Sequence, residues 1–251
     1  MAGHGIDFRG DRRNLRGSRH CAENKQKEKA VMISDYIKIL EGAYITLYGS
    51  AFLPFRQRVY EELPYVISFA VPLPRAVVRE IAAEGPTKTY FHHYRTCNSY
   101  IDHVSYRLTL AIRKAGYDAL YVPASQSVSK DGFQGLFPHK TAAVLCGLGG
   151  IGMNGLLVTA KYGAAVRLGT VMTDMPVPQA EQIENPCRRC GCCVRACPSG
   201  ALYGTAWKDK TPVQDILDVQ LCSAYMKKTY REIGRGAVCG ICMAACPVGA
   251  E

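Results

Sequence analysis

The stretch CRRCGCCVRACPSGA at residues 187–201 shares its pattern with CGICMAACPVGA at residues 239–250. Each copy contains C-G-x-C-x3-C-P-x-G-A, so the second repeats the first from its second cysteine onward. In the first copy, four cysteines follow the spacing C-x2-C-x2-C-x3-C-P, which holds [4Fe–4S] clusters in bacterial two-cluster proteins. The last cysteine of such a run binds the other cluster. The repeat therefore predicts a module that binds two [4Fe–4S] clusters.

The repeat also assigns the thiols to the two clusters. Position 236, the counterpart of Cys187, is a glycine, and Cys222 is the remaining upstream cysteine that can take its place. The two expected ligand sets of this ferredoxin-like module are Cys187, Cys190, Cys193 and Cys246, and Cys197, Cys222, Cys239 and Cys242. Cys192 aligns with Ile241 and is expected to pack rather than to bind metal. A zinc ribbon is the alternative, but its usual two CxxC pairs lack the C-x3-C-P ending that occurs twice here.

Length and composition limit the class of protein. The chain has 251 residues, 48% hydrophobic and 21% charged, as expected of a globular protein with one large or two modest domains. No window approaches about 18 consecutive apolar residues, so neither a membrane-spanning helix nor a membrane partner is expected. Nine of the twelve cysteines lie within residues 187–246. This concentration favours a metal-loaded module in a reducing cytoplasm over a disulfide scaffold.

The N-terminal segment carries much of the formal net charge of +10. Residues 1–31 contain eight Lys or Arg and four Asp or Glu, with few apolar residues, which predicts a disordered basic tail. The pair Arg12-Arg13 is not followed by the apolar stretch of an export signal, so a cytoplasmic location is expected. A loaded cluster module is less basic than the bare chain, because its thiolates outnumber the positive charges of the iron–sulfur cores. The charge therefore does not argue for a nucleic-acid partner.

Between the tail and the cysteines, the sequence predicts alternating helices and strands. The expected helices span residues 33–41, 56–62, 74–84, 90–115 and 139–146. The expected strands span residues 43–50, 65–72, 120–123 and 165–173. This order indicates an α/β or α+β domain over residues 32–180, followed by the cluster module over residues 181–251. Residues 125–138 form a polar loop long enough to suggest ligand binding.

The glycine-rich segment GLGGIG at residues 147–152 matches the dinucleotide fingerprint G-x-G-x-x-G, and Asp174 follows it as a candidate acidic partner. The fingerprint requires a strand before it and a helix after it. Residues 141–146 are poor in β-formers and residues 156–159 look extended, so a nicotinamide-binding domain is the lesser alternative. The glycines are expected instead to admit another bulky cofactor or to form a tight turn.

Four segments together resemble epoxyqueuosine reductases, a family that shares its catalytic fold with reductive dehalogenases. They are HKTAAVLCGLGGIGMNGLLVTAKYGAAVRLGTVMTD (139–174), the first cysteine run (187–201), LDVQLCSAY (217–225) and CGICMAACP (239–247). The resemblance implies a nitroreductase-like α+β domain that binds cobalamin, with the ferredoxin-like module reducing its cobalt. It also implies that residues 147–152 lie against the corrin and that Cys222 is a cluster ligand.

The resemblance also points to individual side chains. The family's proton donor lies on the helix matching residues 89–115, where Asp102 and Tyr100 are the candidates. The expected cofactor-binding residues are His139, Lys140, Gly147, Gly149 and Gly152. Gly150 and Met153 stand where the family usually has Trp and Lys.

The expected activity is reduction by electrons that pass through two clusters to a bound cobalamin. The expected substrate is a small molecule or the corrinoid of a partner protein, and the expected electron donor is a ferredoxin or a flavodoxin. A tRNA substrate is doubtful, because the chain stops at Glu251, before the helical-repeat region of the queuosine enzymes. Two alternatives stay open: a two-cluster electron carrier without its own catalysis, and a nicotinamide- or flavin-dependent iron–sulfur oxidoreductase.

Overall fold

An antiparallel sheet forms the centre of the protein. The computed structural model describes residues 35–208 and 211–249, and its main strands lie in the spatial order β1, β2, β6, β3. They are β1 (Leu47–Phe52), β2 (Tyr65–Pro72), β3 (Ala119–Val122) and β6 (Val166–Thr173). All three neighbouring pairs are antiparallel. With helices packed on the sheet, this arrangement confirms the α+β class, and the finer nitroreductase-like architecture stays a prediction.

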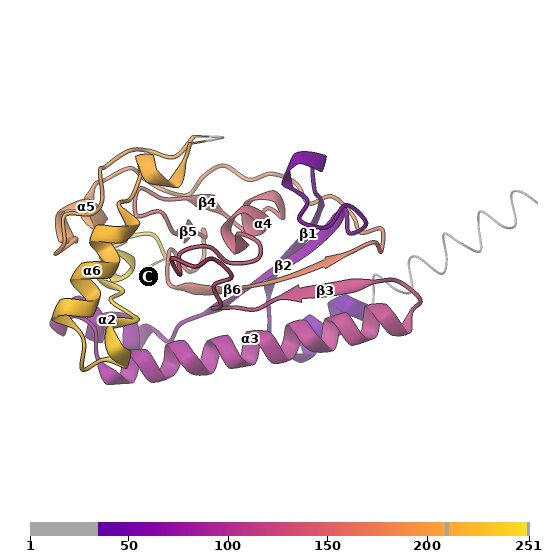
Figure 1. Cartoon of the computed structure of the whole chain (residues 1–251), viewed down its shortest axis with the longest axis horizontal. Coiled ribbons are helices and arrows are strands. Elements are labelled where there is room, and N and C mark those ends of the chain that lie inside the picture. Colours follow the sequence, from indigo (N-terminus) through magenta and orange to yellow (C-terminus); the bar gives the residue numbers. More distant parts are fainter. Residues whose placement is uncertain (1–34, 209–210, 250–251) are drawn as a thin grey trace, which may run out of the picture.

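Helices cover both faces of this sheet. α3 (Lys88–Lys114) runs along one face and α4 (His139–Leu145) lies on the other (Figure 1). Within β2, Ile67 and Phe69 belong to the hydrophobic core that includes α3, whereas Val66 and Ala70 belong to the core that includes α4. Because both faces of the strand are covered, its interior is an almost unbroken apolar run in the sequence.

The long helix α3 connects the sheet with the cysteine-rich part of the chain. Its N-cap residue, Thr87, accepts a hydrogen bond from the backbone N–H of Tyr90 at 3.1 Å through its side-chain oxygen. Ile101 and Leu108 lie two turns apart on the same face of this helix. Both are fully buried against the sheet. Tyr90, in the first turn, is instead buried among residues of the C-terminal part.

The other elements are short. They are the helical residues 35–42, α2 (Arg75–Glu84), the hairpin of β4 (Gly150–Ile151) and β5 (Leu157–Val158), α5 (Cys192–Ala196), α6 (Val219–Thr229), α7 (Ile241–Ala244) and the 3-10 turns Phe55–Gln57, Val213–Asp215 and Gly234–Gly236. None of these described helices, nor α3, is both long and apolar enough to cross a membrane.

Most expected helices and strands occur within a few residues of their predicted bounds. The strand expected at residues 43–50 starts later, at Leu47, because residues 43–46 end the preceding helix. Tyr44 adopts a positive φ of 55° there, and the N–H of Ile45 donates back to the carbonyl of Leu40 at 2.9 Å.

The helix expected at residues 56–62 is wrong. Only the 3-10 turn Phe55–Gln57 forms, and the chain then continues through bends to β2. Pro54 and Pro64 bracket the segment, which leaves too few residues for a stable α-helix. Arg58 instead donates through Nε to the carbonyl of Leu53 at 3.1 Å.

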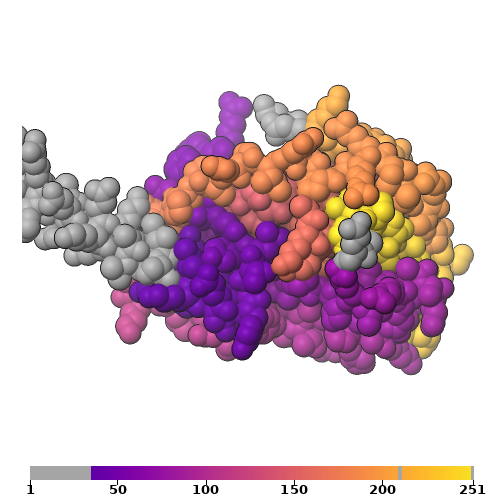
Figure 2. Space-filling model, turned by 180° about the vertical axis from the view of Figure 1, so that it is seen from behind, coloured from indigo at the N-terminus to yellow at the C-terminus, as the bar shows by residue number. Residues whose placement is uncertain are grey.

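The cysteine-rich part shares a hydrophobic core with the rest of the protein. That core comprises Leu73, Val77, Ile81, Tyr90, Val158 and Ala164 together with Val238, Met243 and Val248. Figure 2 shows the yellow C-terminal segment between the purple surface of α2 and α3 and the orange cysteine-rich segment. The chain near residue 180 is held against β1, because the N–H of Ala180 donates to the carbonyl of Ser50 at 2.8 Å. The domain bounds 32–180 and 181–251 stay a prediction, and the tail 1–31 lies outside the described residues.

Candidate metal centres and an adjoining polar site

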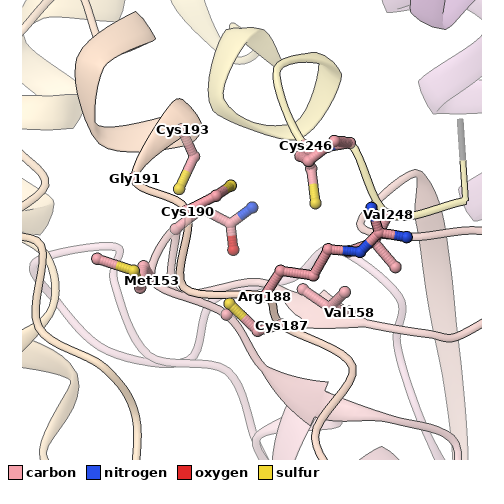
Figure 3. Close-up of a pocket in the computed structure, with 12 residues that line it drawn as sticks. Met153, Val158, Cys187, Arg188, Cys190, Gly191, Cys193, Cys246 and Val248 are labelled. Carbon is pink, nitrogen blue, oxygen red and sulfur yellow. The ribbon is translucent and has the colours of Figure 1, made fainter.

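Four thiols from the two cysteine runs face one cavity. Figure 3 shows the side chains of Cys187, Cys190, Cys193 and Cys246 pointing toward a common space. Gly152, Met153 and Val158 also line this cavity. No three His, Cys, Asp or Glu side chains of the described ranges converge closely enough to hold a single metal ion. Four thiols that face one space are the ligand set of a four-iron cluster.

The other four expected ligands are also neighbours. Burial, with smaller contributions from the thiols of Cys239, Cys222 and Cys197, raises the pKa of Cys242 to about 12. Burial likewise raises the pKa of Cys222, and the thiols of Cys239 and Cys197 add to that shift. The structure thus groups the eight thiols as the repeat predicts, while their role as cluster ligands stays a prediction.

The two thiol groups lie next to each other. The raised pKa of Cys242 is due mainly to burial, but Cys193 of the first group also contributes to it. Asn154, which lines the cavity of the first group, donates through Nδ2 to the carbonyl of Cys242 at 3.4 Å. Clusters bound by the two groups would therefore be close neighbours, as a relay of electrons requires.

Backbone N–H groups donate to several of these thiols. Burial raises the pKa of Cys246, and the N–H groups of Val248 and Ala164 oppose that shift. Burial also acts to raise the pKa of Cys197, but hydrogen bonds from Ser199 and neighbouring N–H groups outweigh it and lower the pKa. Hydrogen bonds of this kind to cluster sulfurs tune the reduction potential of an iron–sulfur cluster.

A polar site, consisting of Tyr94, Asn98, Ser125 and Arg167, lies where α3 crosses β6. The hydroxyl groups of Tyr94 and Ser125 are 2.8 Å apart. The guanidinium of Arg167 lies 4.2 Å from the centroid of the Tyr94 ring and donates through Nε to Oδ1 of Asn98 at 2.9 Å. Burial alone would raise the pKa of Tyr94, but Arg167 and hydrogen bonds with Ser125 and Asn98 outweigh it, so the pKa is lowered. Tyr94 is therefore more acidic than an ordinary tyrosine.

Tyr90 links the second thiol group to this polar site. The rings of Tyr90 and Tyr94 meet edge to face, with centroids 6.3 Å apart. On its other side Tyr90 touches the loop between Cys239 and Cys242, since a Cβ atom at Gly240 would stand 3.0 Å from Cε1 of its ring. Burial, with smaller contributions from the two thiols and against the opposing effect of Arg167, raises the pKa of Tyr90 to about 12. An unbroken series of contacts thus runs from a cysteine loop to the polar site.

The sequence analysis missed Tyr94 and Arg167 as site residues. Arg167 is a single charged residue within an apolar strand. The available signal is that charge, because a cation within a covered strand needs a partner. The pairing with Asn98 and Tyr94 depends on how α3 crosses β6.

The two expected proton donors hold structural positions. The hydroxyl of Tyr100 donates to the carbonyl of Ala43 at 2.6 Å, and its ring packs against the core beneath α3. Oδ1 of Asp102 accepts a hydrogen bond from the N–H of Ala124 at 2.8 Å and so holds the loop after β3. Their role as proton donors stays a prediction, and neither belongs to the polar site.

His139 and Lys140 are both bound to protein groups. Nε2 of His139 donates to the carbonyl of Pro123 at 3.1 Å, so Nδ1 is left to accept from the hydroxyl of Thr170 at 2.8 Å. Burial lowers the pKa of His139, which favours this neutral form. Nζ of Lys140 donates to the carbonyl of Gly155 at 2.6 Å, and burial lowers its pKa as well. These partners account for both side chains, and their contact with a cofactor stays a prediction.

Close packing accounts for the glycines of segment 147–152. A Cβ atom at Gly147 would meet the carbonyl of Glu181, and one at Gly149 would meet the carbonyl of Val158. A Cβ atom at Gly150 would collide with Asn185 and one at Gly152 with Asn154 and Val158. The chain's own atoms thus fill the space beside each glycine. Binding of a cofactor by Gly147, Gly149 and Gly152 stays a prediction without support from this packing.

The same segment lacks the context of a dinucleotide fingerprint. Helix α4 precedes it, and its second half forms β4, the first strand of the β4–β5 hairpin. The fingerprint needs a strand before the glycines and a helix after them, in a parallel sheet. The nicotinamide alternative is therefore unsupported.

Comparison with known proteins agrees with this site. A family model described as a 4Fe-4S dicluster domain matches residues 186–251. The epoxyqueuosine reductase of Lactococcus garvieae is 32% identical over 114 residues, 42% of this chain and 30% of that protein. A tetrachloroethene reductive dehalogenase of Desulfitobacterium hafniense is 27% identical over 230 residues, 84% of this chain and 38% of that protein.

A solved structure shows that the fold is shared. A reductive dehalogenase structure described as suggesting a mechanism for B12-dependent dehalogenation superposes with a TM-score of 0.63, at 19% identity, over 83% of this chain and 31% of that one. The cysteine-rich part of the chain is thus a 4Fe-4S dicluster domain. The homologues of the chain are epoxyqueuosine reductases and reductive dehalogenases, as the resemblance predicted, and it spans 30% to 38% of the length of the two relatives described.

Proposed function

We propose that the protein is an iron–sulfur reductase in which two [4Fe–4S] clusters pass electrons, one at a time, to an acceptor bound at the polar site. One observation carries the proposal: the loop between Cys239 and Cys242 contacts Tyr90, and Tyr90 contacts Tyr94. A carrier that only exchanges electrons with a partner has no need of an acidic phenol beside an arginine. The homologues are themselves iron–sulfur reductases, which supports the same conclusion.

Tyr94 is the residue of this chain best suited to supply a proton. Reductive cleavage of a carbon–oxygen or carbon–halogen bond consumes two electrons and one proton, and yields a C–H bond and an anionic leaving group. The phenol of Tyr94 can give that proton, because Arg167 and Ser125 stabilise the phenolate that is left. Asn98, through its hydrogen bond to Arg167, holds the cation over the ring.

Cobalamin is the cofactor that we propose for this site. The support is the structural similarity to a reductive dehalogenase described as B12-dependent, since a corrinoid supplies cobalt that accepts single electrons at low potential. The thiol cavity fits an iron–sulfur cluster, but the glycine segment offers no open cradle for a corrin. Cobalamin therefore needs a direct test, as do the expected small-molecule or corrinoid-protein substrate and the doubtful tRNA.

Titration of the anaerobically purified holoprotein with cob(II)alamin tests this proposal. Binding is expected to change the visible and EPR spectra of the corrinoid. Protein that contains its clusters but leaves those spectra unchanged would rule out cobalamin. An NADH-induced spectral change of the same protein would instead favour the nicotinamide alternative.

Tyr94→Phe is expected to remove one tyrosine that ionises at unusually low pH. In the wild-type protein the pKa of Tyr94 is lowered, as is that of Tyr162, so the first tyrosinate absorbance should come from these two residues and should shrink in Tyr94→Phe. Ultraviolet difference titration of oxidised protein measures this. Tyr44→Phe is the control, because Tyr44 is 93% exposed and its loss should leave the early phase in place. An early phase whose amplitude is unchanged in Tyr94→Phe would contradict the assignment.

A further inference from the structure

One expected cluster ligand is open to solvent. All eight lie within the described ranges, and among them Cys190 alone is exposed. Cys193 is buried, and the cysteines of the second thiol group are partly covered. A cluster bound by the first group would therefore be the one that a partner protein can approach closely.

Three arginines surround this exposed cysteine. Arg188, Arg189 and Arg195 are all exposed, and together they are called the arginine surface below. Arg188 lines the cavity, and its side chain extends toward Val248 (Figure 3). Arg195 donates from one guanidinium nitrogen to the carbonyl of Cys190 at 3.2 Å. The positive charges are thus held at the opening of the cavity.

Among the described residues, no acidic side chain forms an ion pair with these arginines. Residues 185–208 contain neither Asp nor Glu. Within the part of the chain that the structure describes, the one ion pair joins Lys38 and Asp35, away from the arginines. An unbalanced positive surface raises the encounter rate with an acidic partner and orients it.

We propose that the arginine surface docks an acidic one-electron carrier protein, which reduces the cluster of the first thiol group beside Cys190. Each encounter transfers one electron: the carrier is oxidised by one electron, the cluster is reduced by one, and no bond or proton changes place. This inference rests on the proposed function and gives the relay a direction. Electrons arrive at the arginine surface, pass to the second group, and leave through the contact of its loop with Tyr90.

An RNA is the competing occupant of a positive surface. A redox carrier is favoured because an exposed expected cluster ligand, Cys190, lies among the arginines. The surface also has only three positive charges, whereas nucleic-acid binding usually combines a longer basic stripe with aromatic stacking residues.

The test follows the reduction of oxidised holoprotein by stopped flow with two reductants. Reduced flavodoxin, an acidic protein, reports each electron that it gives by forming its semiquinone. Reduced methyl viologen, a small cation, reports whether the clusters can be reduced at all. The flavodoxin rate constant is expected to fall about tenfold or more as ionic strength rises from low to physiological values. The rate constant for methyl viologen should not fall, because salt screens the repulsion between this cation and the positive surface.

Charge-removing variants locate the docking surface. Arg188→Gln/Arg189→Gln is expected to lower the flavodoxin rate at low salt about tenfold and to weaken its salt dependence. The matched control is Arg113→Gln/Lys114→Gln, which removes two exposed charges from the far end of α3 (Figure 1). This control should change the flavodoxin rate by less than about twofold, because the charges that it removes lie far from the arginine surface. Iron analysis of each variant shows whether the clusters are intact.

The outcomes separate this inference from the proposed function. If reduced methyl viologen reduces the clusters but the flavodoxin rate constant does not depend on salt, the docking surface is wrong and the proposed reductase function stands. Clusters that neither reductant can reduce would overturn both. Equal losses in the two double variants would show that net charge, rather than the arginine surface, sets the rate. Salt-sensitive binding of a tRNA stem loop that only the arginine variant loses, without an effect on flavodoxin, would assign the surface to RNA.

Discussion

Replacing Cys222 with alanine is expected to halve the iron that the protein binds. Wild-type protein purified without oxygen should contain about eight irons per chain, and Cys222→Ala about four. The reason is that Cys222 is the single ligand expected from α6, and the remaining thiols of its group cannot hold a complete four-iron cluster. Iron and sulfide analysis, with the EPR spectrum of the reduced protein, measures the loss.

Cys192→Ala is the matched control for this experiment. Cys192 belongs to the first cysteine run but accepts a hydrogen bond from Arg195 at 3.3 Å and aligns with Ile241 of the repeat. Its removal should leave about eight irons. Iron content that falls in Cys192→Ala and stays complete in Cys222→Ala would reverse the ligand assignment.

The structure explains why the second run needs a ligand from α6. Gly236, the counterpart of Cys187, adopts a φ of 75°, and a Cβ atom there would stand 2.6 Å from the Cα of Lys227. A side chain at position 236 would therefore collide with the backbone of α6. The same helix, capped by the side chain of Asp218, brings Cys222 to the group instead. The second run thus lacks a cysteine at position 236 because the backbone of α6 passes close to it.

The features that could be predicted from the sequence are those whose signal is local. The strand at residues 65–72 is an apolar run between prolines, and the helix at 90–115 has a long 3.6-residue periodicity. The two cysteine groups follow from the repeat, because alignment of its two copies identifies ligands that lie far apart in the chain. The helix expected at 56–62 failed because the flanking prolines outweighed a weak periodic pattern.

The polar site could not be predicted because it exists only after the sheet is assembled. Antiparallel pairing of β6 with β2 and β3 fixes which side chains of β6 face α3, and so brings Arg167 to Tyr94 and Asn98. Likewise, the glycines of segment 147–152 resemble a cofactor motif in the sequence, whereas the fold places the chain's own atoms beside them. In both cases contacts distant in sequence decide the role of the residue.

A backbone contact at Gly163 joins the sheet domain to the end of the cysteine-rich part. Gly163 adopts a φ of 54°, and a Cβ atom there would meet the carbonyl of Val248. The N–H of the next residue, Ala164, acts to lower the pKa of the thiol of Cys246, one of the expected ligands. Gly163→Ala is therefore expected to displace the C-terminal segment and to disturb the first thiol group. The measurements are the apparent Tm at a fixed scan rate and the EPR signal of the reduced clusters.

Gly200→Ala separates this contact from the cost of the backbone conformation. Gly200 also has a positive φ, of 68°, but no atom lies within 4 Å of a Cβ placed there. Alanine in this conformation costs about 1–2 kcal/mol, or roughly 2–8 °C in Tm for a chain of this size. Gly163→Ala adds a collision between two backbones, which no side-chain rotation relieves, so its Tm should fall at least about twice as far. Equal shifts in the two variants would mean that the contact with Val248 can yield. A larger shift confined to Gly163→Ala, with a changed EPR signal, would show that the cysteine-rich part depends on this contact for its metal geometry.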